Sequence, residues 1–338
     1  MLVAHPEGEL YRRASEGPDL VGLAPHTEID LAAAWKLSKV VRQYAPQIVH
    51  AHDPHAVAMA ATALSFGAPS PRPMLVASRR VDFHLNSHSF SKWKYRQVDR
   101  FVTASGAIRD ILLHDGVPAS IIDVVHDGID VAAVQRLPVI DIHAEFWLPH
   151  GVPVVAHVGA LVAHKGQKHL VDAMRFVRRD VPDAHLVMFG EGELRGALER
   201  QIKEQRLEKY VLLAGFREDV LQLVKSADLF VMSSVTEGLG SAVLDAMAMG
   251  LAVVGTRAGG IPEAVVHGET GLLVEPGEPK PLADAIVRLI RDAELRSRLG
   301  AAGRVRVAEH FGVDRLVEGT LKSYENAWAK AVTTAPGR

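Results

Sequence analysis

A short stretch, TEGLGSAVLDAMAMG, places two carboxylates, Glu237 and Asp245, around a Gly-x-Gly step at the start of an apolar helix. Gly238 and Gly240 allow the backbone to approach a ligand closely, because a residue without a Cβ tolerates the dihedral angles of tight turns. Backbone N–H groups at the start of a helix bind anions such as phosphate. The stretch therefore predicts an anion site flanked by two acids that can accept hydrogen bonds from hydroxyl groups.

The amides of this candidate site include those of Leu239 and Ser241, where the helix begins. The strand that leads into it ends at Ser234, and ligands of parallel α/β sheets bind beyond the carboxyl ends of the strands. A second interpretation stays open at this point. The two acids also favour the positive end of the helix dipole while pointing into solvent, in which case they only stabilise the helix.

The composition is that of an ordinary globular protein, long enough for two domains. The chain has 338 residues, of which 48% are hydrophobic and 23% charged, and a formal net charge of -2. Single cores seldom exceed roughly 300 residues, so we expect two domains of about 150 residues each. The weak net charge gives no field for a polyanion, which excludes nucleic acid as an implied partner. Cysteine is absent and no apolar run approaches about 18 residues, so we expect a cytoplasmic protein.

The second half alternates short β-branched runs with amphipathic helical runs, which is typical of β-α units on a parallel sheet. One helical run, QKHLVDAMRFVRRD, has Leu170, Met174 and Val177 on a single stripe. The first half repeats the arrangement less regularly, so we expect an α/β fold of two Rossmann-like, doubly wound parallel-sheet domains. The strands expected in the second half are Val154–Gly159, His185–Phe189, Val211–Gly215, Leu229–Ser233, Ala252–Thr256 and Gly271–Val274.

The same pattern predicts where the domains lie. The periodicity lapses between Pro138 and Pro153, which places a boundary there. We therefore expect a first domain over residues 1–145 and a second over residues 150–310. The last third is helical with no further strand, so the helix over residues 311–332 must bury its apolar stripe elsewhere. We expect that helix to pack back on the first domain.

The first half carries histidines and arginines at the ends of two expected strands. In IVHAHDPHA, the two-residue alternation puts His50 and His52 on the same side of a strand, with His52 nearer its carboxyl end. The histidines and Asp53 of this run invite a metal site, but no Asp-x-Asp pair stands at a strand end. In VASRRVDF, Arg79 and Arg80 end the next strand, where they suit a phosphate or an acidic acceptor, or form a solvated pair.

With these residues in place, the sequence resembles the GT-B glycosyltransferases of retaining family 4. EGLGSAVLDAMAMGLAVVGTRAGGIPEAVVHGETGLLVEPGE follows the signature of that family almost position for position, and VGALVAHKGQKHLVDA is similar to its phosphate-loop segment. The resemblance extends from about Val3 to Leu289 and is most specific from Leu229 to Gly277. It implies transfer of a sugar from a nucleotide diphosphate-sugar to an acceptor, with retained anomeric configuration, between two Rossmann-like domains.

On the donor side, the resemblance implies a role for each matching residue. Glu237 is similar to the acid that holds the donor sugar, and Asp245 to the acid that holds the ribose. The loop from Gly238 to Ser241 would then place its amides on the sugar and the β-phosphate. Lys165, in a loop that begins at Gly159, matches the lysine that steadies the departing diphosphate, although a solvated loop lysine is the alternative.

Outside that loop the resemblance is less specific. His52 matches a histidine near the reacting carbon, with a core or capping histidine as the alternative. Phe216 follows the third strand of the second domain, where the family holds the base. The family needs no bound metal or other cofactor, so we expect no metal site and no cofactor beside the donor substrate.

This chain departs from the family pattern at three places. The family usually has Glu where Asp245 stands, and often an arginine where Ala160 stands, so Arg79 or Arg80 is expected to replace that cation. The chain also starts at MLVAHP, without the strand, glycine turn and helix with which the family usually opens. We therefore expect a shortened first domain with an exposed sheet edge or a hole.

Several functions fit these features. The first is a retaining glycosyltransferase with a glycan or lipid-linked acceptor, in cell-envelope polysaccharide synthesis and with peripheral contact at the inner face of the membrane. A catalytically silent nucleotide-sugar-binding or scaffold protein is the second, because of the shortened start. A GT-B sugar-nucleotide epimerase is the third. UDP, GDP and ADP all stay open as the donor nucleotide.

Overall fold

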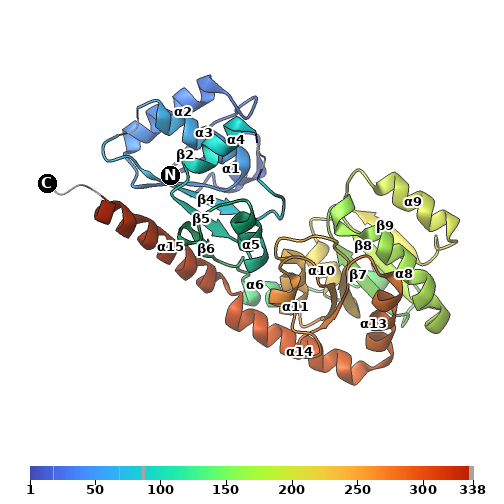
Figure 1. The fold of residues 1–338 in the computed structure, drawn as a ribbon. Helices are drawn as coiled ribbons and strands as arrows, with labels where there is room; N and C mark the ends of the chain where they lie inside the picture. The colour runs from blue at the N-terminus through green and yellow to red at the C-terminus, as the bar shows by residue number, and fades with distance from the viewer. Residues whose placement is uncertain (18, 68, 86–87, 335–338) are drawn as a thin grey trace.

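Three parallel sheets and their covering helices form two α/β lobes (Figure 1). The computed structural model describes residues 1–17, 19–67, 69–85 and 88–334. Within these residues, a four-stranded and a two-stranded sheet belong to the first domain, and a six-stranded sheet forms the second. The predicted α/β class with parallel sheets in both domains is confirmed.

The sheet of the second domain has the strand order β12-β11-β10-β7-β8-β9. The chain runs outward from β7 through β8 to β9, and then returns to pair β10 with the other side of β7. The order therefore reverses between β7 and β10, and ligands of open α/β sheets bind at the carboxyl ends of the strands beside such a switch point. The strands are β7 (Val154–Val158), β8 (His185–Phe189), β9 (Val211–Gly215), β10 (Leu229–Met232), β11 (Ala252–Thr256) and β12 (Leu272–Val274).

Helices cover both faces of this sheet. Successive residues of a strand point to opposite faces, so each strand packs against both helix layers. Val155 packs in the core under α8 and α13, whereas its neighbours Val154 and Ala156 pack under α11 and α12. Both faces are thus apolar, as in a doubly wound sheet. The helices are α8 (Gln167–Asp180), α9 (Arg195–Glu204), α10 (Val220–Val224), α11 (Ser241–Ala248), α12 (Ile261–Ala264), α13 (Pro279–Arg291) and α14 (Ala293–His310), with the 3-10 turn η2 (Ala163–Lys165) before α8.

The four-stranded sheet of the first domain follows the order of the chain, β3-β4-β5-β6, without a reversal. Leu75 and Ala77 of β4 pack against the core under α2 and α3, whereas Met74 and Val76 lie in the cluster on the opposite face. Every residue of β4 is buried, which explains the apolar run from Met74 to Ala77 before Ser78 and Arg79. The elements are β3 (Ile48–Ala51), β4 (Met74–Arg79), β5 (Arg100–Thr103), β6 (Ile122–Val124), α2 (Leu31–Tyr44), α3 (Pro54–Ser65), α4 (Ser89–Arg96), α5 (Gly106–His114) and the 3-10 turn η1 (Ala119–Ile121).

A separate two-stranded sheet opens the chain. Strands β1 (Leu2–Ala4) and β2 (Leu20–Gly22) pair in parallel across α1 (Glu9–Arg13). Over the described residues, neither strand pairs with the four-stranded sheet. Val3 and Leu23 nevertheless pack against the core that lies under α2 and α3. The first domain therefore has two sheets over a shared core.

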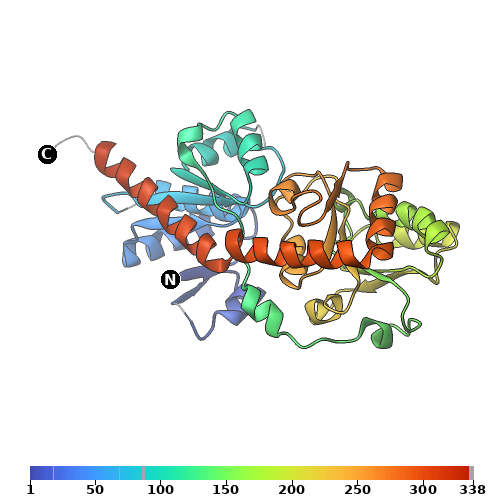
Figure 2. The ribbon, with the colours of Figure 1, turned by 90° about the horizontal axis from the view of Figure 1, so that it is seen from below.

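The chain crosses between the domains twice. Helices α6 (Val131–Arg136) and α7 (Ile142–Glu145) lead into the second domain and contribute to its core. After α14, helix α15 (Val313–Thr334) runs back along the first domain (Figure 2). Tyr324 and Ala327 of α15 pack against the face of β4 and β5. None of the described helices combines the length and apolar character needed to cross a bilayer.

Candidate active site

The loop between β7 and α8 carries Lys165 at the carboxyl end of β7. The loop passes through η2 into Gly166, whose φ of 66° lies in the left-handed region. A Cβ on Gly166 would overlap the carbonyl oxygen of Ser233, which follows β10. Only glycine allows the loop to lie this close to the neighbouring strand.

Hydrogen bonds tie this loop to the loop between β10 and α11, on the other side of the switch point. The amide of Val235 donates to the carbonyl oxygen of His164 at 2.7 Å. The hydroxyl of Ser233 donates to the carbonyl oxygen of Lys165 at 3.1 Å. The backbone of Lys165 is thereby held against the exit of β10.

Lys165 and Glu237 form an ion pair where the two loops meet. Their Nζ and Oε2 atoms are 2.6 Å apart, and the hydroxyl of Ser234 donates to the same carboxylate oxygen at 3.0 Å. The two side chains are only 18% and 10% exposed. Charges this far from water are stable only when they are paired, so each side chain fixes the position of the other. The pair is the charged centre of the switch point.

The N-terminus of α11 follows this pair directly. Gly240 precedes the helix with a φ of 89°, and no side chain caps the first turn. Leu239 is 2% exposed and anchors the loop in the core, whereas Ser241 is exposed. Helix N-termini without a capping side chain present unpaired amides and a positive dipole end. The loop is therefore suited to an anion next to the ammonium group of Lys165.

Asp245 lies one turn into α11 and is partly buried. Burial raises the pKa of its carboxyl to about 6, and no described residue forms a hydrogen bond or ion pair with it. A desolvated carboxylate is unfavourable, and such groups cluster at binding and catalytic sites. Asp245 is thus available to a ligand that brings hydroxyl donors.

A buried polar network supports the β7–α8 loop. Burial lowers the pKa of the His157 imidazole to about 4, so the ring is neutral. Its Nδ1 lies 2.9 Å from the carbonyl oxygen of Val231 and carries the proton donated there. The side chain of Gln167 lies 3.4 Å from Nε2 of His157 and donates to the carbonyl oxygen of Ala160 at 2.7 Å. Neither His157 nor Gln167 was identified from the sequence, since a histidine inside an apolar strand gives no sign of its partner.

In the first domain, His50 and His52 lie side by side at the end of β3. Their rings stack with centroids 4.1 Å apart. His50 also lies 2.7 Å from the hydroxyl of Tyr324 in α15 and 2.8 Å from that of Ser78. Burial, together with His52 and Arg80, lowers the pKa of His50 to about 4, and desolvation with the charge of Arg80 lowers the pKa of His52. Both rings are therefore neutral near pH 7, and each can donate one hydrogen bond and accept another.

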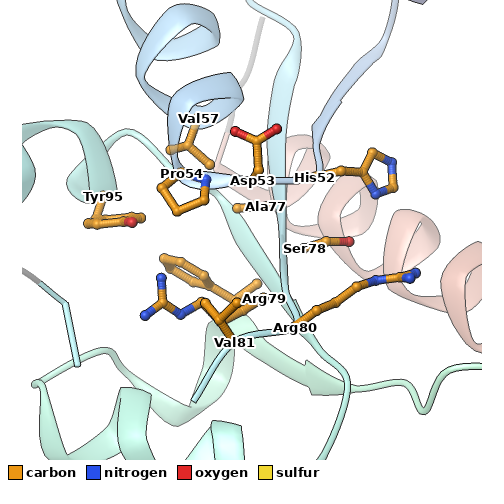
Figure 3. Close-up of a pocket in the computed structure, with 11 residues that line it drawn as sticks. His52, Asp53, Pro54, Val57, Ala77, Ser78, Arg79, Arg80, Val81 and Tyr95 are labelled. Carbon is orange, nitrogen blue, oxygen red and sulfur yellow. The ribbon is translucent and has the colours of Figure 1, made fainter. Parts of the chain in front are cut away.

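Arg79 and Arg80 point in opposite directions at the end of β4 (Figure 3). Arg80 is half exposed and forms an ion pair with Asp127 at 3.2 Å. Arg79 is 6% exposed and extends toward Tyr95. The adjacent arginines therefore belong to different environments and are not a solvated pair.

Glu263 of α12 joins the two domains. Its carboxylate accepts hydrogen bonds from the amides of Gly106 and Ala107, at 3.0 and 3.1 Å, at the start of α5. It also lies 2.8 Å from Nε2 of His126. Burial opposes ionisation, but the hydrogen bonds from His126 and the two amides hold the pKa of Glu263 below its usual value. A negative charge of the second domain thus caps a helix of the first.

Two further contacts bring the first domain to the switch point. A Cβ on Gly238 would collide with the carbonyl oxygen of Arg80. The rings of Phe83 and His164 meet edge to face, with centroids 5.8 Å apart. The segment from Arg80 to Phe83 therefore lies against both loops of the switch point.

Gly159 and Phe216 lie at the same edge of the second sheet. The amide of Gly159 donates to the carbonyl oxygen of Phe189 at 2.9 Å, and a Cβ on Gly190 would overlap the carbonyl oxygen of Gly159. Gly159 is thus part of a closely packed backbone. Phe216 follows β9 and is 74% exposed, so its ring is open to a planar ligand.

The structure therefore brings together Lys165, Glu237 and the 238–241 loop at one switch point. Asp245 lies in the helix that this loop begins, whereas Phe216 follows a different strand, β9. His52 and the two arginines line a pocket of the facing domain. A cation beside a helix N-terminus binds an anionic group, and carboxylates bind hydroxyl donors. The arrangement can hold a ligand that carries both an anionic group and hydroxyl groups.

Comparison with known protein families assigns the two halves of the chain separately. Residues 140–306 match the family profile of glycosyl transferases group 1, and residues 2–133 match that of glycosyltransferase family 4. Alpha-maltose-1-phosphate synthase of Mycolicibacterium smegmatis is 32% identical over 271 residues, which is 72% of this chain and 68% of that protein. N-acetyl-alpha-D-glucosaminyl L-malate synthase of Bacillus anthracis is 30% identical over 200 residues, 59% of this chain and 52% of that protein.

Coverage differs between sequence and structure comparisons. The chain matches about half the length of the Bacillus protein and of a Rhizobium meliloti lipopolysaccharide core biosynthesis glycosyltransferase, 52% and 53% respectively. Among solved structures, Anabaena HepE in complex with UDP and glucose superposes with a TM-score of 0.84 at 21% identity, over 96% of this chain and 90% of that one. That likeness identifies the fold of the chain as two Rossmann-like domains of the GT-B type.

Proposed function

The chain belongs to the family 4 and group 1 glycosyltransferases of the GT-B fold, and from this premise we propose that it transfers a sugar from a nucleotide diphosphate-sugar to an acceptor with retained anomeric configuration. The observation that carries the proposal is the Lys165–Glu237 pair beside the N-terminus of α11. The pair stands at the switch point of the second sheet, which is where open α/β sheets bind their ligands.

Lys165 and the amides of α11 receive the diphosphate. The ammonium group is held by Glu237 and by the backbone contacts of its loop, so it needs no rearrangement before it meets a charged group. Negative charge grows on the diphosphate as its bond to the sugar breaks. A cation and helix dipole fixed in advance at that position lower the barrier more than mobile groups would.

Glu237 and Asp245 receive hydroxyl groups of the donor. Glu237 retains carboxylate lone pairs beside the diphosphate position, which suits the sugar, while Asp245 lies further along α11, which suits the ribose. Asp is one methylene shorter than the Glu of similar proteins, so the ribose lies closer to the helix. Phe216 offers its exposed ring to the base.

The protein acts in this reaction through position and charge. The acceptor hydroxyl oxygen bonds to the anomeric carbon on the face from which the diphosphate leaves, and the departing phosphate oxygen takes the hydroxyl proton. Neutral His52 and the cation Arg80 flank this step from the first domain. Holding both reactants in this geometry replaces a nucleophilic side chain.

We assign the protein to cell-envelope polysaccharide synthesis in the cytoplasm, with a glycan or lipid-linked acceptor and peripheral contact at the inner face of the membrane. The support is the similarity to proteins such as the lipopolysaccharide core glycosyltransferase of Rhizobium meliloti, which is 31% identical over 192 residues.

A panel of donors tests the proposal. The protein is incubated with UDP-, GDP- and ADP-sugars, and its melting temperature and the release of nucleoside diphosphate are followed with and without acceptors. The proposal predicts that one donor raises the melting temperature and that acceptor accelerates diphosphate release. Binding without release would instead establish a silent nucleotide-sugar-binding protein. Release or epimerisation that ignores every acceptor would establish a sugar-nucleotide epimerase.

A further inference from the structure

A pocket of about 70 Å³ lies in the first domain at the carboxyl ends of β3 and β4 (Figure 3). Its walls are largely apolar or aromatic, including Pro54, Val57, Tyr95 and Phe101. One water molecule needs roughly 10–15 Å³ of such a cavity, so the pocket has room for a group of several heavy atoms. Arg79 reaches into it from β4.

Arg79 is a buried cation without a carboxylate. It is 6% exposed, and no acid of the described residues lies within ion-pair distance of its guanidinium group. One of its nitrogens donates to the carbonyl oxygen of Phe83, and its Nε is buried with no partner. A buried charge is unfavourable unless an opposite charge or a full set of hydrogen bonds compensates it. The guanidinium group of Arg79 therefore lacks a compensating anion.

Two neighbouring cations, unlike Arg79, are each paired with a carboxylate. Lys94 is buried and paired with Glu28, and Arg80 is paired with Asp127. Lys94 directly precedes the pocket residue Tyr95, and Arg80 itself lines the pocket next to Arg79. The surroundings therefore supply carboxylates to the other cations but none to Arg79.

Two acids near Arg79 leave its charge uncompensated. Asp53 lines the pocket but is exposed, and its Oδ1 accepts the amides of His55 and Ala56 as the cap of α3. Asp82, three residues after Arg79, forms no ion pair with it, and its Oδ2 is itself buried without a partner. The exposed carboxylate is screened by water, so the buried guanidinium dominates the pocket.

We propose that this pocket binds the anionic group, a carboxylate or a phosphate, of the acceptor substrate. The inference rests on the proposed glycosyl transfer and specifies its acceptor as an acid. The guanidinium fork matches either oxyanion, and the apolar walls take the carbon skeleton that carries it. His52 lines the same pocket, and the segment after Arg79 touches both donor loops. An acid held by Arg79 therefore presents its hydroxyl group toward the donor.

Anion titration tests this inference with the donor site filled. The protein is saturated with the nucleoside diphosphate that the donor panel selects, and inorganic phosphate, succinate and neutral 1,4-butanediol are titrated by calorimetry. We expect saturable binding of phosphate or succinate and none of the diol. R79Q should weaken anion binding at least tenfold, and R79K by less, because lysine retains the charge but loses the fork. R72Q, at an exposed arginine already paired with Asp99, should leave anion affinity unchanged.

The outcomes separate this inference from the proposed function. Phosphate and succinate distinguish the two sources of the anion, since a site that prefers one indicates a phosphorylated or a carboxylic acceptor. If neither anion binds the wild type, or if R79Q and R79K bind both as tightly as the wild type, the acidic acceptor is wrong. Nucleotide affinity should be the same in R79Q and the wild type. Failure of the wild type to bind any nucleotide overturns the glycosyl-transfer proposal, whatever the anions do.

Discussion

The two domains bring charge to their sheet edges in different ways. In the second domain, the strand order reverses, and the loops on either side of the reversal pair Lys165 with Glu237. In the first domain, the four-stranded sheet has no reversal, and Arg79 at the end of β4 is buried without a carboxylate. One site is complete within its own loops, and the other requires a ligand to complete it.

The two sides of this two-domain site are organised differently. The donor side is fixed in advance by glycines, backbone hydrogen bonds and a buried ion pair. Preorganised groups of this kind contribute most where charge develops during the reaction. The pocket of the first domain contains the uncompensated cation Arg79, so its affinity for a ligand depends on the charge of that ligand. We therefore expect variants of the second domain to change the rate, and variants of the first to change which acceptor is used.

The largest effect is expected at the ion pair of the second domain. E237Q keeps the shape of the side chain but removes the charge beside Lys165 and the strong acceptor for the sugar. We predict a loss of turnover of about 100- to 1,000-fold, typical of a preorganised electrostatic contact. Steady-state kinetics with the selected donor measure it. E269Q, at an exposed glutamate, is the control. Turnover of E237Q within a factor of three of the wild type would refute the role of Glu237.

Asp245 should show opposite effects on binding and on stability. D245N weakens the contact with the ribose, so nucleotide affinity falls roughly tenfold. Burial raises the pKa of Asp245 from 3.8 to about 6, so the native state binds more protons than the unfolded state in that interval. Ionised Asp245 therefore destabilises the fold increasingly as the pH rises through this window.

Removing the Asp245 carboxylate should then stabilise the protein at neutral pH. We expect D245N to gain about 2 kcal/mol at pH 7.5 and roughly half of that at pH 5. Urea unfolding at the two pH values gives the comparison. A variant that is less stable than the wild type at pH 7.5 would show that the carboxylate has a partner in the native protein.

The contact between the domains gives a smaller effect. E263Q weakens the hydrogen bonds to the start of α5 and to His126, with an expected cost of about 1–2 kcal/mol. Because the pKa of Glu263 is held low, this stability is present at neutral pH and is lost as the pH falls through that pKa. Melting temperature and limited proteolysis measure the loosening.

A matched control for Glu263 is E275Q, which removes an exposed ion pair with Arg257 at 3.4 Å. Such surface pairs contribute about 0–1 kcal/mol, so this variant should resemble the wild type. Equal stability of E263Q and E275Q at pH 7 would mean that the carboxylate does not hold the domains together.

The smallest effect is expected at Phe216. F216A removes an exposed ring, so the melting temperature without ligand should not change. Stacking on a base contributes about 1 kcal/mol, which predicts a roughly fivefold rise in the Kd for the nucleotide. Calorimetry with the nucleoside diphosphate decides the point. Unchanged affinity would place the base elsewhere along the sheet edge.

The sequence predicted the frame of the second domain closely. Strands His185–Phe189, Val211–Gly215 and Ala252–Thr256 are found at the predicted bounds. Every residue of β8 and β11 is buried, and β9 is apolar although its three central residues are only partly buried, so apolar runs mark all three strands. Apart from β4, the strands of the first domain are three or four residues long, and β1 and β2 form a sheet of their own, which no local pattern reveals.

Residues of the candidate site could be predicted only where a motif in the surrounding sequence marks them. Lys165 and Glu237 each lie in a glycine-containing loop whose spacing indicates a ligand, and the structure places them 2.6 Å apart. Glu263 contacts Gly106 across 157 positions, so the role of this acid in joining the domains has no signal in its own segment. The contrast between Arg79 and Arg80 likewise depends on which arginine has a carboxylate beside it.

The most direct test of the account is a crystal structure of the protein with the nucleoside diphosphate that the donor panel selects. We expect the diphosphate to lie against the N-terminus of α11 and within hydrogen-bond distance of Nζ of Lys165, with the ribose beside Asp245. A diphosphate bound away from Lys165 and α11, with the Lys165–Glu237 pair untouched, would contradict it.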